Sequence, residues 1–280
     1  MKTLLCSVSL MTLVAMSPAA LARAELSDAQ MERIAAGAGS AALTSTVNQT
    51  ANSTSTATCT NCSGTASGAA PGVAVSSGSQ AINITNVHEV LTGAAGKNAT
   101  GPVTVSSTVN QTANSTSTAT CTNCTGTGSG TGSGIAVSSG SQAVNLANVH
   151  LVVTGGAVHK ATGPITVSST INQIANSSST ATCTNCTGTA GGTGSGIGVS
   201  SGSLALNVAN VDLVVGGGPK AQGAVTLSST VNQLANSGST AACTSCTGTG
   251  ASGVGVSSGS QALNIANIRQ VAGGLGGGRR

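Results

Sequence analysis

Hydrophobic and polar residues alternate along most of this chain with a period of two. From residue 103 to residue 120, the odd positions carry valine, alanine, serine and one glutamine, while the even positions carry threonine, serine and asparagine. Alternation over this length predicts a β-strand with one face buried and the other in water. At about 3.3 Å per residue such a strand would run near 60 Å, so we expect a corner part-way, near residues 111–115.

A second strand is predicted at residues 135–153. Apolar residues such as Leu146 and Val149 fall on both of its faces, so this arm should be more deeply buried than the first. We expect a break in it at Gly140. Glycine-rich runs separate the strands and should form turns or loops; these are residues 125–134, 187–196 and 247–253.

The same pattern occurs four times along the chain. Each copy has a strand with a β-branched residue followed by Asn-Gln, then Cys-x-x-Cys, a Gly/Ser/Thr run, Val-Ser-Ser-Gly-Ser and an Asn-x-Ala-Asn-like segment. Successive copies are offset by 62, 62 and 60 residues. A fixed period predicts units that stack on their neighbours instead of closing one core. The copies are residues 41–101, 102–163, 164–223 and 224–280, the last with a Gly/Arg tail.

Composition favours an all-β repetitive fold. The chain has 40 glycines and no Phe, Tyr or Trp, so it lacks the large side chains of an ordinary compact domain. Only 5% of residues are charged and the aliphatic residues are regularly spaced, which fits disorder poorly. We therefore predict a β-solenoid or stack of β-arcs in four copies. Through the first three copies, Ala-Asn pairs (Thr85-Asn86 in one case) alternate at spacings of 34 and 28 residues, which leaves open a rung of about 31 or about 62 residues.

Residues 1–24 have the layout of a secretory signal peptide, with a cationic start, a short apolar run and small residues before the expected cleavage point. No later stretch reaches the roughly 18 apolar residues of a membrane helix, so we expect no membrane span. Residues 25–40 predict a short helix and linker, with Ser27 as N-cap and Gln30 closing a capping box. Gly37 is the stop of this helix or, as a resemblance of Leu26, Met31 and Ile34 to double-glycine leaders of exported bacterial peptides implies, a second processing site. The chain is expected to be secreted, extracellular or at the cell surface.

Beyond residue 24 the chain has eight cysteines in four Cys-x-x-Cys pairs. A four-residue turn brings its end α-carbons within about 7 Å, and a disulfide needs about 4.4–6.8 Å, so a bridge within each pair is feasible. Bridges between adjacent rungs, four-thiolate zinc sites and cross-links between subunits are the alternatives. An exported chain favours disulfides over free thiolates. The pairs are Cys59–Cys62, Cys121–Cys124, Cys183–Cys186 and Cys243–Cys246.

The sequence offers little other chemistry. None of its five carboxylates recurs beside a His or Ser, so we expect no enzymatic activity and no cofactor. The cations are few and scattered and aromatic residues are missing, so nucleic-acid binding is not expected. Equivalent positions of the copies carry His88, His150, Asp212 and Arg269. We interpret this as a solvent-facing position and not a metal column, because arginine is no metal ligand.

Segments such as residues 109–114 and 261–267 resemble bacterial functional amyloids and fibre subunits of the curli and Fap type. The likeness covers roughly residues 43–271 and lies in composition and style of repeat. It implies a fibre or biofilm matrix built from stacked strands, in which ladders of Asn and Gln satisfy one another. The ladder residues would be Asn48, Gln49, Asn110, Gln111, Asn172, Gln173, Asn232 and Gln233.

We therefore expect a secreted structural protein, a self-assembling β-rich subunit of an extracellular fibre or biofilm matrix. Its main partner would be itself, with an outer-membrane secretion pore as a further candidate, since the chain has no membrane barrel of its own. A surface-binding, ice-binding or adhesin protein that presents a Thr/Ser/Asn face is the alternative. Thr104 and Thr108 belong to that face.

Overall fold

The computed structural model describes residues 21–23, 41–93, 101–155, 163–216 and 223–273. These residues form β-strands joined by turns, and no helix occurs among them. The helix expected within residues 25–40 and the processing site at Gly37 lie outside the described residues. The described chain is thus all-β, as its alternating pattern predicts.

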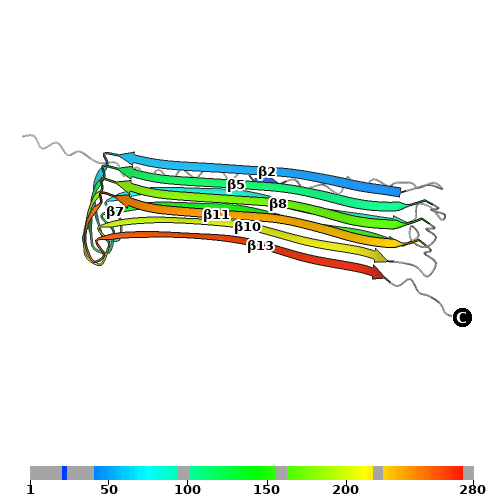
Figure 1. The fold of residues 1–280 in the computed structure, drawn as a ribbon. Coiled ribbons are helices and arrows are strands. Elements are labelled where there is room, and N and C mark those ends of the chain that lie inside the picture. The colour runs from blue at the N-terminus through cyan, green and yellow to red at the C-terminus, as the bar shows by residue number, and fades with distance from the viewer. Residues whose placement is uncertain (1–20, 24–40, 94–100, 156–162, 217–222, 274–280) are drawn as a thin grey trace, which may run out of the picture.

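Each copy of the repeat folds into one rung with two long strands and one short strand. Figure 1 shows the long strands in two layers, with the strands of one layer running opposite to those of the other. A short strand and a turn join the two layers at one end. The first rung holds β2 (Ala41–Thr60), β3 (Ser63–Ser67) and β4 (Val73–Gly93); the second β5 (Val103–Thr122), β6 (Thr125–Ser129) and β7 (Ile135–Gly155); the third β8 (Ile165–Thr184), β9 (Thr187–Gly191) and β10 (Ile197–Gly216); the fourth β11 (Val225–Thr244), β12 (Thr247–Thr249) and β13 (Val254–Gly273).

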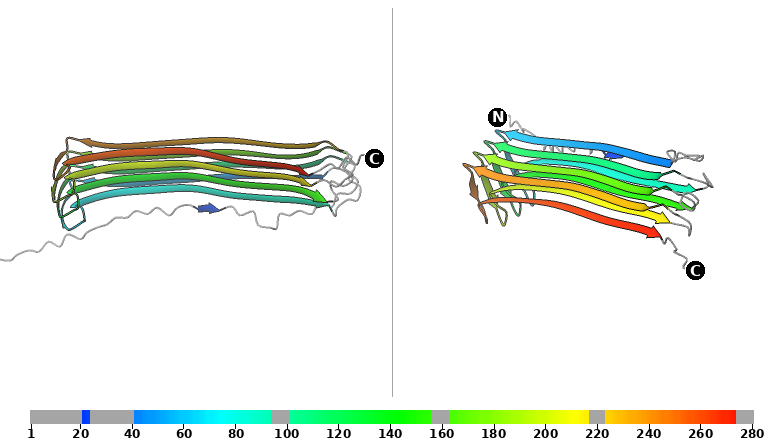
Figure 2. Two further views of the ribbon diagram at one scale, coloured as in Figure 1. Left: turned by 90° about the horizontal axis from the view of Figure 1, so that it is seen from below. Right: turned by 45° about the vertical axis from the view of Figure 1, so that its right-hand side comes forward.

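Equivalent strands of successive rungs pair in parallel and form three sheets. Sheet A has the order β1-β4-β7-β10-β13, where β1 (Leu21–Arg23) is a three-residue strand beside β4. Sheet B has the order β11-β8-β5-β2, and the short sheet C the order β12-β9-β6-β3. Both views in Figure 2 show the long strands running along the length of the molecule.

Identical positions of the repeat pair with one another. Val109 lies between Val47 and Ile171, and ladder partners in the first three rungs are 62 residues apart. The spacing falls to 60 residues between β8 and β11 and to 57 between β10 and β13. A rung is therefore a whole copy of the repeat, and the apparent half-repeat reflects its two facing arms.

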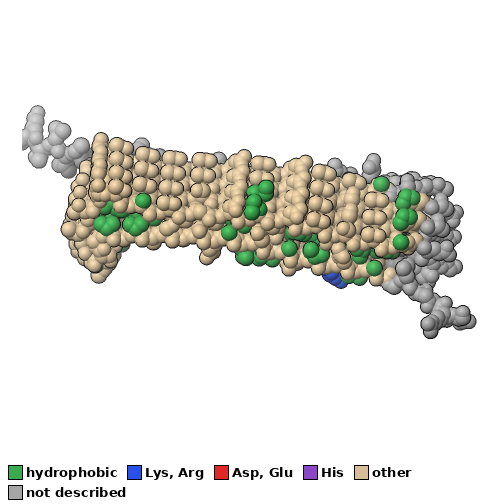
Figure 3. Space-filling model, viewed as in Figure 1, with side chains coloured by type: hydrophobic (Ala, Val, Ile, Leu, Met, Phe, Trp, Pro, Cys, Tyr) green, Lys and Arg blue, Asp and Glu red, His purple; other side chains and the backbone are tan. Residues whose placement is uncertain are grey.

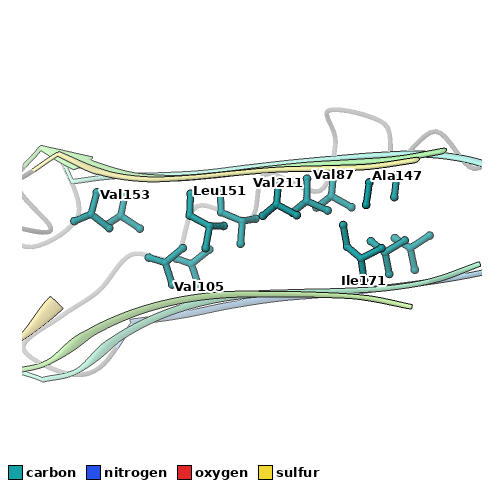
Figure 4. Close-up of a cluster of buried hydrophobic side chains, with 14 of the residues drawn as sticks. Val87, Val105, Ala147, Leu151, Val153, Ile171 and Val211 are labelled. Atoms are coloured by element: carbon teal, nitrogen blue, oxygen red, sulfur yellow. The ribbon is translucent and has the colours of Figure 1, made fainter. Parts of the chain in front are cut away.

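The core lies between sheets A and B and is filled by alternate residues of each long strand. Figure 4 shows Leu151, Val153 and Val211 pointing from sheet A towards Val105 and Ile171 of sheet B. Near the middle of the sheets, alanines from both meet in a separate cluster. Small and β-branched residues thus close the core without any aromatic side chain.

The expected corner near residues 111–115 is wrong, because β5 continues unbroken from Val103 to Thr122. The arm β7 has almost the same length and covers the inner residues of β5 throughout, so nothing requires the chain to turn. The break expected at Gly140 is also wrong, since this residue lies inside β7 and pairs in register with its neighbours.

Two further expectations need correction. The glycine-rich runs are not wholly loops, because their first residues form β6, β9 and β12 of sheet C. The second arm is not buried on both faces either: Val144 and Leu146 lie on the outer face of sheet A and are only partly buried. Gly126 shows why glycine is needed in sheet C, since an added Cβ would collide with the carbonyl oxygen of Gly134.

Two isoleucines of β8 test which face is buried. Ile171 is 0% exposed and Ile174 is 39% exposed. We expect Ile171→Ala to lower the free energy of unfolding by about 2–5 kcal/mol through the cavity it leaves. The matched control Ile174→Ala should change it by less than about 0.5 kcal/mol. Thermal midpoints followed by circular dichroism compare the two; equal shifts would contradict the assignment of faces.

Candidate functional site

The inner glutamines of sheet B form a continuous ladder across the four rungs. The Nε2 atoms of Gln111, Gln173 and Gln233 each donate to the Oε1 atom of the preceding rung's glutamine, at 2.8–3.0 Å. Gln111, which is 1% exposed, also donates to the main-chain oxygen of Leu146 in sheet A, at 3.0 Å. Each buried amide is therefore satisfied along the stack and across it, as burial of a polar group requires.

The outer face of sheet B holds the asparagine ladder that the resemblance implies. Asn48, Asn110, Asn172 and Asn232 are joined by hydrogen bonds of 2.7–2.8 Å. All eight expected ladder residues are thus in register and hydrogen-bonded along the stack. Further outer ladders join Asn52, Asn114, Asn176 and Asn236 in sheet B and Asn86, Asn148, Asn210 and Asn267 in sheet A.

One further ladder, which the sequence did not predict, lies on the inner face of sheet A. It consists of Asn83, Asn145, Asn207 and Asn264, and its Nδ2 atoms donate towards the fourth rung at 2.8–2.9 Å. The first three of these asparagines also donate to main-chain oxygens of sheet B, as Asn145 does to Ile174 at 2.7 Å. The signal in the sequence was an asparagine five residues before the His, Asp or Arg in all four copies, as from Asn83 to His88. Its face could not be read from the local pattern.

The cysteine pairs stand at the turn between the long strands and sheet C. Within each pair the sulfur atoms lie at disulfide distance and the α-carbons are 5.9–6.1 Å apart. The residue before the second cysteine has a positive φ, for example 53° at Asn123, a conformation that asparagine tolerates well. Cys121 and Cys124 are 0% exposed and pack against Ile135 and Val137, so the pair fills the corner of the core.

Stacking also brings cysteines of adjacent rungs together. Cys121 pairs in register with Cys59 and Cys183, and the sulfur atoms of Cys121, Cys183 and Cys186 all lie within 4.8 Å of one another. Bridges between rungs, or a metal held by thiolates, are therefore alternatives that proximity alone does not exclude. In the structure, each disulfide joins the two cysteines of one Cys-x-x-Cys pair.

The column of His88, His150, Asp212 and Arg269 lies on the outer face of sheet A. The two imidazole rings stack with centroids 4.8 Å apart, and the Asp212 Oδ2 atom lies 3.6 Å from His150 Nε2 and 3.7 Å from Arg269 Nη1. Among the described residues, the groups that could hold a metal contain only cysteines. Partly exposed ion pairs of this kind contribute little stability.

The fourth rung leaves the strands β11, β12 and β13 at the edges of their sheets. Apolar side chains are exposed there, and Leu234, Leu263 and Ile268 are each 50% exposed. An edge strand presents main-chain N–H and C=O groups to any further strand. The fourth rung therefore combines open hydrogen-bonding groups with uncovered apolar surface.

The first rung carries unpaired polar atoms on its inner face. Glu89 is 9% exposed, although Leu151 and Leu213 hold the same position in the second and third rungs. Burial raises the pKa of the Glu89 carboxyl group, and a hydrogen bond with Ser45 opposes this shift. The Oε2 atom of Glu89 and the Oδ1 atom of Asn83 are buried without a hydrogen-bond partner.

No family model, curated protein or solved structure matches this chain. Within the described residues there is no helix long and apolar enough to cross a membrane. The arrangement of the ladders, the cysteine corner and the end rungs is therefore the basis on which a function can be proposed.

Two glutamines test the contribution of the inner ladder. Gln111→Ala removes a buried amide that is bonded to both neighbouring rungs and to sheet A, and we expect it to cost about 2–4 kcal/mol of unfolding free energy. Gln142→Ala is the control, because this glutamine is exposed and bonded to Gln80. It should cost less than about 0.5 kcal/mol. Similar shifts of the thermal midpoint for both variants would contradict a buried ladder.

The cysteine pairs predict a defined disulfide pattern. Alkylation of the protein purified without reductant should label none of these eight cysteines, and proteolysis with mass spectrometry should recover links within pairs, such as Cys121–Cys124. Replacing this pair by serines should cost about 2 kcal/mol, the entropy of so short a loop. Full labelling without reductant, or a Cys59–Cys121 link, would contradict the pattern.

Proposed function

We propose that the protein is a secreted structural subunit that assembles with copies of itself into an extracellular fibre or biofilm matrix. The observation that carries this proposal is the parallel, in-register stack, whose fourth rung ends in three edge strands. Parallel in-register strands with amide ladders can continue from one chain into the next, since each added rung repeats contacts already present.

Two further features support assembly along the stack. An added rung would cover the exposed Ile268, as Val211 is covered within the chain, and would partly cover Leu263, since its equivalent Leu206 is partly buried. Only 5% of residues are charged, so electrostatic repulsion between subunits would be weak. The likeness to curli- and Fap-type subunits in repeat style points in the same direction.

The outer face of sheet B favours a second candidate, a protein that binds ice or another surface. Regular rows of polar side chains run across this face in Figure 3, and some rows consist only of threonine, such as Thr56, Thr118, Thr180 and Thr240. Ile174 and Leu234 interrupt the polar face, at 39% and 50% exposure. Thermal hysteresis or surface binding by the monomer, without fibres, would favour this candidate.

The fibre proposal predicts assembly of the purified exported chain. Incubation at high concentration should give an amyloid-dye signal, filaments in electron micrographs and a fibre-diffraction reflection near 4.8 Å along the filament axis. The chain kept in denaturant is the control and should give none of these. A folded protein that stays monomeric at high concentration would contradict the proposal.

A further inference from the structure

One inner column of sheet A distinguishes the end rungs from the middle rungs. It contains Glu89, Leu151, Leu213 and Gln270, paired in register. The middle rungs place leucine in the core, whereas both end rungs place a polar side chain there. Burying a polar group costs free energy unless the group has a hydrogen-bond partner. The polar residues of this column should therefore have partners at the two ends of the stack.

The two ends carry complementary hydrogen-bonding groups. At the first rung, Glu89 Oε2 and Asn83 Oδ1 are acceptors without partners. At the fourth rung, Gln270 donates from Nε2 to Ser229 at 3.1 Å, and Asn264 donates from Nδ2 to a main-chain oxygen at 3.4 Å. An amide nitrogen carries two hydrogens, so each of these donors has capacity for another acceptor.

We propose that a second copy of this chain stacks head-to-tail, with the fourth rung of one copy against the first rung of the next. Gln270 then donates to Glu89 Oε2, and Asn264 donates to Asn83 Oδ1. This inference rests on the proposed fibre function and specifies its contact. The partner, the direction of stacking and the residues at the junction are all defined.

The direction of the existing ladders supports this orientation. In the inner asparagine ladder, every Nδ2 atom donates towards the fourth rung, so Asn264 is the donor left at that end. The glutamine ladder has the opposite direction, and Gln49 at its first-rung end donates only to a main-chain oxygen. Both ladders continue in their own directions when rung four meets rung one. A head-to-head contact would oppose two Asn83 acceptors.

The edge of β4 accepts a parallel strand in this structure. β1 pairs there with residues 82–84, with Ala22 in register with Asn83, and Asn83 Oδ1 still has no partner. Residues 1–24 are the predicted signal peptide, so export would free this edge. A head-to-tail contact joins two different surfaces by a translation, which does not close and so produces an open filament.

A charge swap tests the junction, using seeded elongation of fibres followed by dye fluorescence. Gln270→Glu places two carboxylates on adjacent strands, about 4.8 Å apart, and should slow elongation about tenfold or more. The double variant Glu89→Gln/Gln270→Glu restores one amide and one carboxylate and should return to within about threefold of the wild-type rate. The control Gln261→Glu, on the outer face of the same strand, should change the rate by less than about twofold. Circular dichroism of each monomer checks that it folds.

The outcomes separate this inference from the fibre function. Wild-type fibres with an unaffected Gln270→Glu variant, or a double variant as slow as the single one, would overturn the junction and leave the fibre function standing. Absence of wild-type fibres would remove the function itself. Glu89→Gln alone should elongate near the wild-type rate; an approximately tenfold faster rate would show that the carboxylate opposes stacking, and would also overturn the junction.

Discussion

Parallel pairing in register is the constraint on which the structure depends. Each residue has the equivalent residue of the next copy as its neighbour, one strand spacing away, about 4.8 Å. The side chains that can lie beside an identical side chain at this distance are apolar, hydroxyl or amide groups, because like charges repel and amides can donate to one another. The low charge and the abundance of Val, Ala, Ser, Thr, Asn and Gln follow from this requirement.

The same constraint explains how a core without aromatic residues remains closed. Alanines of the two sheets meet near the middle, where Gln111 and Asn145 reach across to main-chain oxygens of the facing sheet. The amides therefore join the sheets as well as the rungs. Aliphatic clusters lie on either side of this polar zone, and buried cysteines extend one of them to the corner.

The sequence predicted the elements that a local pattern can specify. Alternation identified the inner and outer residues of β5, and the repeat identified which residues stack. The straightness of β5 could not be read in the same way, because it depends on the facing arm β7. The face of Asn145 was equally ambiguous, since residues 144–149 place both aliphatic and asparagine side chains on each face. Only the packing of sheet A on sheet B decides between them.

The leucines at positions 151 and 213 have a consequence for the length of the molecule. Duplicating the segment 102–163 in the gene would add one internal rung and lengthen the particle by about 4.8 Å, while every contact type stays the same. Duplicating the first or last copy would instead enclose a Glu89 or Gln270 side chain between its own duplicate and a leucine-bearing layer. Duplication of an internal copy can therefore increase the number of rungs with little loss of stability, whereas the first and last copies have to remain at the ends of the stack.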